Sequence, residues 1–435
     1  MRTAIIPKML LIVVCLFCLA VSSERLSAAS DDERLAWWRE ARFGMFIHYG
    51  PVTLTGKELS WSRANSNPKC PNKGETPVEV YDNLYKQFNP TKFDANQWVE
   101  VAKKAGMKYI VLTAKHCDGF LLWNSKVDGY NISATPFQRD ICAELAQAVH
   151  QKGIRLGWYF SPMDWRDQDC RNEHNSDFVI RMQNELRELL TNYGRIDLLW
   201  FDTDGRSAPW DQPTTYKIVK TLQPDIIINN RLDMNSQADY NRQQVFPPAD
   251  YFTPEQKVGT YNDKTPWETC MTLGTQWSWK PDDKIKSISE VVRILVRCVG
   301  GDGNLLLNVG PMPDGQIEPR QVEVLNGVGD WLAKNGESIY GTRSGPFKPT
   351  PSYGASTRKG NKIFIHLFNL SDNPVKLPAI PAKILNSTVL TGGTAKVIQN
   401  DDGIEISVPS AERAKIDTIV VLTLDKPAMS ITLLP

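Results

Sequence analysis

The stretch Asp197-Leu198-Leu199-Trp200-Phe201-Asp202-Thr203-Asp204-Gly205 decides the fold class of this chain. It starts as an apolar run and ends in carboxylates and a glycine, which is typical of a buried parallel strand followed by a turn. Side chains alternate along a strand, so Trp200, Asp202 and Asp204 share one face. Burying a carboxylate is costly, and in barrels of parallel strands catalytic groups lie at the carboxyl ends. Asp202 is therefore the candidate catalytic centre.

Strand-like and helix-like segments alternate on both sides of this stretch, from Ala41 to about Tyr340. Strands are predicted at 43–50, 108–116, 154–161, 197–202, 225–230, 267–273, 303–311 and 337–341. Helices are predicted at 93–105, 140–152, 175–193, 214–222, 287–298 and 319–335. A long irregular segment covers 232–266. The alternation predicts parallel βα units, and their number predicts a (β/α)₈-like TIM barrel.

The pattern changes near Phe347, after which residues alternate between apolar and polar without any helix signal. Such alternation is typical of an antiparallel β-sandwich. The predicted domains are a barrel over residues 30–346 and a C-terminal β-sandwich, with a structural role, over residues 347–435.

Composition excludes some partners. The chain has 435 residues, with 50 Lys and Arg against 49 Asp and Glu. This balance gives no reason to expect nucleic acid or an anionic membrane surface as a partner. The hydrophobic share of 41% and charged share of 23% are those of a globular protein.

The N-terminus is typical of a secretory signal peptide. Arg2 and Lys8 form a basic region, residues 9–21 are apolar, and residues 26–30 are mostly small. The apolar run is too short for a membrane anchor, so no membrane insertion is expected. The sequence predicts removal of residues 1–29 and a secreted or periplasmic protein (lysosomal or extracellular in a eukaryote). Six scattered cysteines would remain (Cys70, Cys117, Cys142, Cys170, Cys270 and Cys298), and their pairing is not predicted.

Polar or ionisable residues stand at the carboxyl end of nearly every predicted strand. They are His48, His116, Tyr159, Asp202, Asn230 with Arg231, Glu268, and Asn308. Any one of them could be a cap or a satisfied core group. Because these strand ends meet at one mouth of a barrel, the set together predicts a binding site.

The motifs that the sequence lacks exclude several classes of reaction at this site. No G-x-S-x-G stands at a strand–helix turn, the five histidines are not paired, and no glycine-rich loop opens a helix. No metal or cofactor is therefore expected. Carboxylates among tryptophans and tyrosines remain, and a pair of carboxylates is the usual machinery for cutting glycosidic bonds.

At this point the chain resembles the retaining α-L-fucosidases of glycoside hydrolase family 29. The resemblance lies in 43–48 (FGMFIH), 114–120 (AKHCDGF), 158–161 (WYFS), 200–202 (WFD), 230–231 (NR), 266–268 (PWE), 304–311 (NLLLNVGP) and 339–343 (IYGTR). It implies a barrel with a C-terminal β-sandwich. It also implies exo-acting hydrolysis of terminal α-L-fucose from oligosaccharides or glycoconjugates, by double displacement with net retention. Oligomeric state is not predicted.

By this resemblance Asp202 is the nucleophile, with Asp204 as the alternative. The resemblance assigns fucose contacts to His48, His116, Tyr159, Trp200 and Arg231. Arg231 is also expected to pair with Asp202 and lower the pKa of its carboxyl by attraction.

Two residues are candidates for the general acid/base. Glu255 lies on the long segment after the fifth strand and resembles the family's acid/base position. Glu268 ends a strand and could orient other groups instead. We favour Glu255.

The chain departs from the family in two places. Many members have Glu-Trp where this chain has Ser60-Trp61, with Glu58 two residues earlier, and many have His-His at His116-Cys117. Trp61 or Glu58 is expected to serve in place of the first pair. The departures leave two alternatives open: a non-catalytic carbohydrate-binding barrel, and a retaining hydrolase of a related sugar such as an α-L-galactoside.

Overall fold

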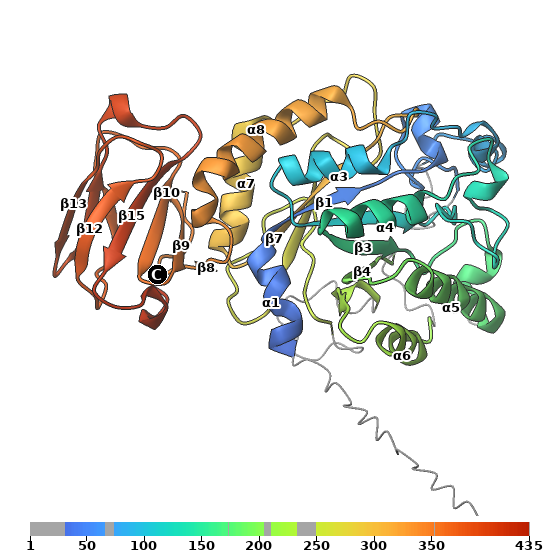
Figure 1. Ribbon diagram of the computed structural model, residues 1–435, viewed down its shortest axis with the longest axis horizontal. Helices are drawn as coiled ribbons and strands as arrows, with labels where there is room; N and C mark the ends of the chain where they lie inside the picture. Colours follow the sequence, from blue (N-terminus) through green and yellow to red (C-terminus); the bar gives the residue numbers. More distant parts are fainter. Residues whose placement is uncertain are drawn as a thin grey trace, which may run out of the picture.

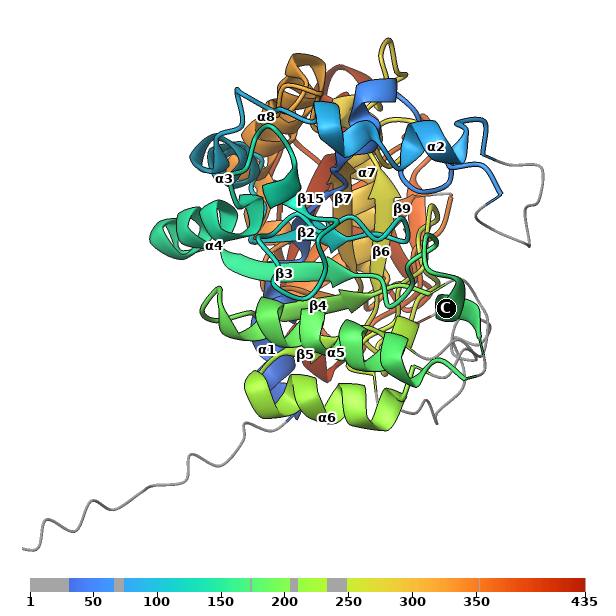
Figure 2. The same ribbon diagram turned by 90° about the vertical axis from the view of Figure 1, so that its right-hand side faces the viewer.

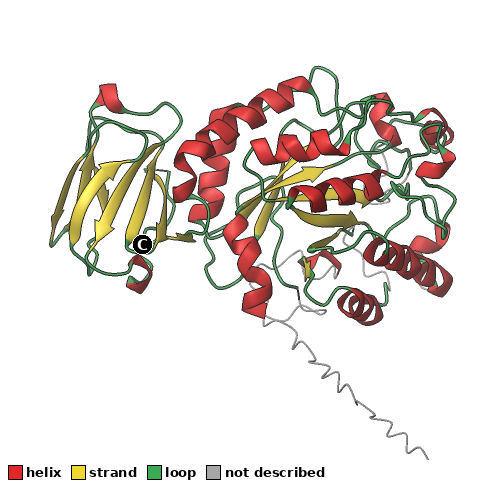
Figure 3. Cartoon of the chain, in the orientation of Figure 1, coloured by secondary structure: helices red, strands yellow, loops and turns green. Residues whose placement is uncertain are grey.

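The structure is a computed structural model that describes residues 31–65, 74–172, 174–203, 210–232, 249–351 and 353–434. The expected signal peptide, Cys70 and Asp204 lie outside the described residues. The chain forms a larger part of strands wrapped by helices and a smaller part made of strands (Figures 1 and 3).

The larger part is built on parallel strands in the order β5-β4-β3-β2-β1-β7-β6. Their bounds are β1 Phe43–Ile47, β2 Tyr109–Lys115, β3 Arg155–Phe160, β4 Leu198–Phe201, β5 Ile227–Ile228, β6 Glu268–Thr272 and β7 Asn304–Val309. Nearly every residue of these strands is buried, as expected for a parallel sheet covered on both faces. The predicted TIM-barrel-like fold is confirmed.

A segment outside the regular strands closes the sheet into a barrel. Tyr251 bridges Asn229 at the end of β5, and Glu255 bridges Cys270 in β6, both in parallel. Between them, the Glu268 N–H donates to the Phe252 carbonyl (2.8 Å). Residues 251–255 therefore take the eighth position, within the segment that the sequence predicted to be irregular.

The prediction that residues 337–341 form the eighth strand is wrong. Gly336–Ser338 is a 3₁₀ turn that continues directly from the preceding helix. A strand there would need extended backbone, whereas Gly341 has a positive φ of 65° and ends the turn.

Helices wrap the outside of the barrel, and α3 to α6 follow one another around it in Figure 2. Their bounds are α1 Asp31–Ala41, α2 Val78–Tyr81, α3 Ala95–Lys104, α4 Ile141–Lys152, α5 Ser176–Thr191, α6 Gln212–Leu222, α7 Ile288–Gly300 and α8 Pro319–Asn335. The sequence did not predict α1. A capping box formed by Ser287 and Glu290 begins α7. None of the helices in the described ranges is both long and apolar enough to cross a bilayer.

The smaller part contains two antiparallel sheets, ordered β12-β15-β10-β9-β8 and β11-β14-β13. Their bounds are β8 Arg343–Ser344, β9 Gly354–Lys359, β10 Lys362–Leu367, β11 Val375–Leu377, β12 Ile384–Val389, β13 Lys396–Asn400, β14 Gly403–Ser407 and β15 Thr418–Leu424. Apolar residues of both sheets form one core, which includes Ile365, Leu422 and Ile406. Because β8 already pairs with β9, the first sheet begins before the predicted boundary at Phe347.

Candidate active site

A small pocket of about 190 Å³ lies at the carboxyl ends of the barrel strands. It is lined by Phe46, His48, Trp61, His116, Tyr159, Trp200, Asp202, Thr203, Arg231, Glu255, Cys270 and Trp277. Eight of the predicted site residues are in this set: His48, Trp61, His116, Tyr159, Trp200, Asp202, Arg231 and Glu255. Glu268 and the strand-end residues Asn230 and Asn308 are not. The barrel therefore brings together side chains that are more than 200 residues apart in the sequence.

Arg231 joins the two carboxylates of the pocket. Its Nη1 lies 3.0 Å from Asp202 Oδ1 and 2.9 Å from Glu255 Oε2. Two oxygens in contact with one nitrogen are at most about 5.9 Å apart, the two contacts laid end to end. Thr253 fixes the guanidinium from the other side, accepting from Nε at its hydroxyl (2.7 Å) and from Nη2 at its carbonyl (3.0 Å). The closing strand segment thus positions both Arg231 and Glu255.

Asp202 follows β4 and has a second hydrogen-bond donor. The Tyr159 hydroxyl donates to Oδ2 (2.9 Å), while Arg231 occupies Oδ1. Burial raises the pKa of Asp202 above its ordinary value; attraction by Arg231 opposes this, and repulsion by Glu255 adds to it. The expected lowering of the pKa by Arg231 is present, and desolvation outweighs it.

Three rings at the ends of β2, β3 and β4 form one wall of the pocket. His116 and Tyr159 stack with centroids 5.2 Å apart, and Tyr159 and Trp200 stack at 5.5 Å. The Arg231 guanidinium lies 4.6 Å from the Trp200 ring centroid. Trp61 lies at the rim, where its side chain is 38% exposed. The wall is apolar over its ring faces, with polar atoms at its edges.

The two pocket histidines are each held through Nδ1. His48 Nδ1 lies 2.7 Å from Asn308 Oδ1, and His116 Nδ1 lies 2.6 Å from Ser60 Oγ. Burial lowers the pKa of His116 to about 3. Burial, together with repulsion from His116, lowers the pKa of His48 well below its ordinary value. Both rings are therefore neutral at neutral pH.

Glu268 lies outside the pocket lining. The prediction that it ends a strand is wrong, because it is the first residue of β6 and the pocket lies at the opposite, carboxyl ends of the strands. Its carboxylate is fully buried and accepts from Trp38 Nε1 (3.2 Å), Trp200 Nε1 (3.3 Å) and the Tyr109 hydroxyl (2.5 Å). Burial raises the pKa of this carboxyl to about 7, against the lowering effect of the three donors. Its contacts suit it to hold Trp200, whose ring forms part of the pocket wall.

A model of the family "Alpha-L-fucosidase" matches residues 20–337, most of the chain. The chain belongs to the α-L-fucosidases of glycoside hydrolase family 29. It is 31% identical to tissue α-L-fucosidase of Mus musculus over 340 residues, covering 71% of this chain and 72% of the relative.

Solved fucosidase structures share the fold. Isoenzyme 1 of Paenibacillus thiaminolyticus has a TM-score of 0.81 and 32% identity, and the match covers 92% of this chain and 100% of that one. A Bacteroides thetaiotaomicron fucosidase, trapped as a covalent intermediate with 2-fluoro-fucosyl fluoride, has a TM-score of 0.79 and 28% identity, covering 92% and 97%.

The residues at which this fucosidase departs from the family pattern make hydrogen bonds of their own. Ser60 supplies the hydroxyl that holds His116. Glu58 does not line the pocket; its carboxylate accepts from the backbone N–H groups of Trp277 (2.8 Å) and Ser278 (3.1 Å). Cys117 also lies outside the pocket lining, with Sγ 3.4 Å from Ser161 Oγ.

Sequence reasoning missed four residues of the fucosidase pocket: Phe46, Thr203, Cys270 and Trp277. Phe46 and Cys270 lie within predicted strands, and their alternation with neighbouring residues was a usable signal. Trp277 lies on a loop after β6, and no local pattern in the sequence predicts that this loop folds over His48.

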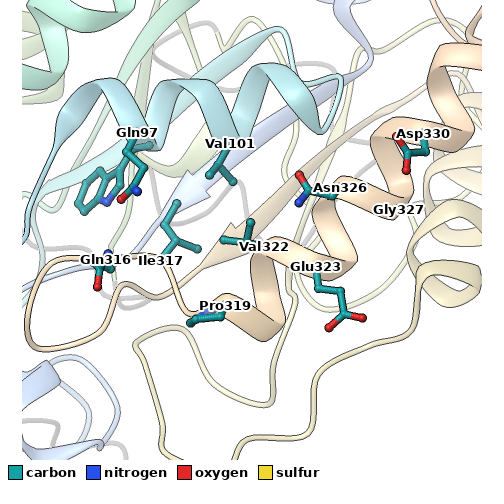
Figure 4. A pocket seen from close by; sticks show the side chains of 11 residues that line it. Gln97, Val101, Gln316, Ile317, Pro319, Val322, Glu323, Asn326, Gly327 and Asp330 are labelled. Atoms are coloured by element: carbon teal, nitrogen blue, oxygen red, sulfur yellow. The ribbon is translucent and has the colours of Figure 1, made fainter.

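A larger hollow of about 570 Å³ lies between α3 and α8 on the outside of the barrel (Figure 4). Val101, Ile317 and Val322 are among the apolar residues that line it. Both of its carboxylates, Glu323 and Asp330, belong to α8. Unlike the strand-end pocket, it does not bring together ionisable groups from different strands, and we do not assign the reaction to it.

Proposed function

We propose that this fucosidase is exo-acting and removes terminal α-L-fucose from glycans by double displacement with net retention. The observation that carries the proposal is the Arg231 nitrogen shared by Asp202 and Glu255. It limits their nearest oxygens to a separation of about 5.9 Å. Retaining glycosidases place their two carboxyl groups ~5–5.5 Å apart, whereas inverting enzymes need ~6.5–9.5 Å to admit a water.

In the proposed mechanism Asp202 attacks the anomeric carbon and forms a β-fucosyl ester as the glycosidic C–O bond breaks. Glu255 gives its proton to the departing oxygen. Glu255 then takes a proton from water, which attacks the same carbon and releases Asp202. Tyr159 and Arg231 hold the Asp202 carboxylate in place through their hydrogen bonds.

The pocket supports a single deoxysugar ring as the bound unit. Its volume of about 190 Å³ is below the ~300–1,000 Å³ typical of sites for drug-sized ligands. Rings of Phe46, Trp200 and Trp277 supply apolar surface for the methyl group of fucose. An α-L-galactoside carries a hydroxyl on that carbon, so the apolar wall favours the fucoside. The alternative of a non-catalytic binding barrel has less support, because both carboxylates line the pocket.

Chemical rescue tests the acid/base assignment. Glu255→Ala is expected to lose at least 100-fold in deglycosylation, in line with the ~10²–10⁴ that general acid–base catalysis contributes. Azide should restore turnover of an activated aryl α-L-fucoside, because it attacks the ester without needing a base. Glu268→Ala is the matched control and should gain nothing from azide. Rescue of Glu268→Ala alone would reverse the assignment.

Stereochemistry tests the mechanism separately. During hydrolysis of an aryl α-L-fucoside, NMR should detect α-L-fucose first, before mutarotation produces the β anomer. Initial release of β-L-fucose would rule out double displacement.

We also propose that the protein is exported and loses residues 1–29, on the basis of the basic, apolar and small-residue regions of its N-terminus. N-terminal sequencing of the exported protein should start close to Ser30. An intact Met1 on the exported protein would contradict this proposal.

A further inference from the structure

The hydrogen bonds of Asn308 fix which nitrogen of His48 carries the proton. Asn308 Nδ2 donates to the Trp277 carbonyl (2.7 Å), so the amide oxygen of Asn308 faces the His48 ring. That oxygen only accepts hydrogen bonds, and it lies 2.7 Å from His48 Nδ1. His48 Nδ1 therefore carries the proton. In a neutral ring this leaves a lone pair on Nε2.

The hydrogen bonds of Ser60 fix the opposite tautomer in His116. The Asp118 backbone N–H donates to Ser60 Oγ (2.8 Å), which uses the hydroxyl as an acceptor. The hydroxyl also has one proton to donate, and among the described contacts of Ser60 Oγ only His116 Nδ1, 2.6 Å away, can accept it. His116 Nδ1 accepts, so the neutral ring carries its proton on Nε2.

A closed set of contacts keeps Ser60 in this position. The Tyr81 hydroxyl accepts from the Ser60 backbone N–H (2.7 Å) and donates to Asp118 Oδ2 (2.7 Å). Ser60 is fully buried and has a positive φ of 58°, so its backbone is constrained as well. The orientation of the hydroxyl therefore depends on three residues that lie outside the pocket lining.

We propose that Asn308 and Ser60 are positioning residues that set opposite tautomers, so that His48 Nε2 accepts and His116 Nε2–H donates toward the sugar. The two rings are neighbours, with centroids 5.6 Å apart, and both line the pocket. No other described residue hydrogen-bonds either Nε2. The inference rests on the proposed function and adds a rule for substrate choice: the ligand must offer a hydroxyl proton to His48 and an oxygen lone pair to His116.

NMR of the histidine rings tests the tautomers without any need for turnover. The chain has five histidines, so ¹⁵N-histidine labelling gives few signals, which single His→Gln variants can assign. We expect the Nδ1–H form for His48 and the Nε2–H form for His116. Ser60→Ala and Ser60→Gly should both shift His116 toward a mixture and leave His48 unchanged; glycine also tolerates the positive φ. Asn308→Ala should do the reverse.

The same tautomer in both rings, or no response of His116 to either Ser60 variant, would overturn the proposal. An inactive protein with the two assigned tautomers would instead contradict the proposed function alone.

Substrate analogues test the consequence for specificity. Each ring hydroxyl of an aryl α-L-fucoside is replaced in turn by hydrogen or by fluorine, which cannot donate a hydrogen bond. At the hydroxyl contacting His48, both analogues should lose roughly 10-fold or more in kcat/KM, because a buried acceptor is left unpaired. For each protein, kcat/KM for the analogue is divided by kcat/KM for the parent substrate. Comparing this ratio between a variant and the wild type cancels the inductive effect of fluorine.

Ser60→Ala should reduce discrimination between parent and analogue at the hydroxyl contacting His116. Asn308→Ala should reduce it at the hydroxyl contacting His48. If both variants weaken discrimination equally at every ring position, the pocket has merely loosened and the proposal is wrong.

Discussion

At the scale of single residues, the site depends on how Arg231 divides its contacts. The guanidinium is buried, contacts both carboxylates through one nitrogen, and is held by Thr253 on its other side. Burial alone would favour a protonated Asp202, which could not act as a nucleophile. The positive charge beside it opposes that effect, and the Tyr159 hydroxyl donates to the ionised form.

This balance predicts the pH dependence of an Arg231 variant. In Arg231→Met the attraction is lost while the burial remains, so the pKa of Asp202 rises further. The acid limb of the kcat/KM profile should therefore move to higher pH, since Asp202 must be ionised to react. Arg231→Lys keeps the charge and should shift the limb less. An unchanged acid limb in Arg231→Met, or a shift to lower pH, would contradict this role for Arg231.

At the scale of elements, the regular strands were predictable and the closing strand was not. Buried parallel strands consist of continuous apolar runs, and their carboxyl ends were recognisable from the polar residue that follows, as at His48 and Asp202. Residues 251–255 give no such signal, because the stretch is short and contains Pro254. Its pairing with β5 and β6 depends on the closure of the whole barrel. Glu255 was therefore assigned to a loop, although the structure pairs it with Cys270.

The buried carboxyl of Glu268, at the start of β6, predicts how the stability of the fold depends on pH. Its carboxyl has a pKa of about 7 in the folded state, above the ~4.3 expected in an unfolded chain. The folded state therefore binds more protons between these values, and stability falls as pH rises through this window, by on the order of 3 kcal/mol.

Chemical denaturation of Glu268→Gln at pH 5 and pH 8 measures this effect. The free energy of unfolding of the variant should fall less between the two pH values than that of the wild type. Glu323→Gln on α8, an exposed position, should follow the wild type. Equal pH dependence in wild type and Glu268→Gln would show that Glu268 is not the source.

At the scale of the whole molecule, the five-stranded sheet serves as a support for the barrel. Its Ala355, Phe364 and Val421 belong to the same apolar core as the barrel and its helices. Arg293 on α7 adds polar contacts, donating to the carbonyls of Phe368 (3.0 Å) and Ile416 (2.9 Å). Figure 1 shows this sheet next to α7 and α8, on the side of these two helices that faces away from the barrel strands. The alternating pattern predicted the strands, but not which face packs on the barrel.

The close approach of α7 to β9 predicts a destabilising substitution. A Cβ at Gly300 would lie 2.5 Å from the Cβ of Ala355, so Gly300→Val must push the sheet away from the helix. Overpacking of this kind costs about 1–3 kcal/mol. The variant should unfold at lower temperature, whereas its KM should stay near wild type because the pocket is lined by other elements. Gly129→Val, at an exposed position with nothing within 4 Å, is the control. A Gly300→Val variant as stable as the control would show that this contact does not support the fold.

In the proposed mechanism Asp202 becomes covalently bonded to fucose, and trapping the ester tests this step most directly. Incubation of the wild-type protein with 2-deoxy-2-fluoro-fucosyl fluoride, followed by proteolysis and mass spectrometry, should locate one fluorofucosyl group on the peptide that contains Asp202. Asp202→Asn should remain unlabelled under the same conditions. A label on Glu255, on Glu268 or on any other residue would contradict the account, as would turnover of the reagent by Asp202→Asn at the wild-type rate.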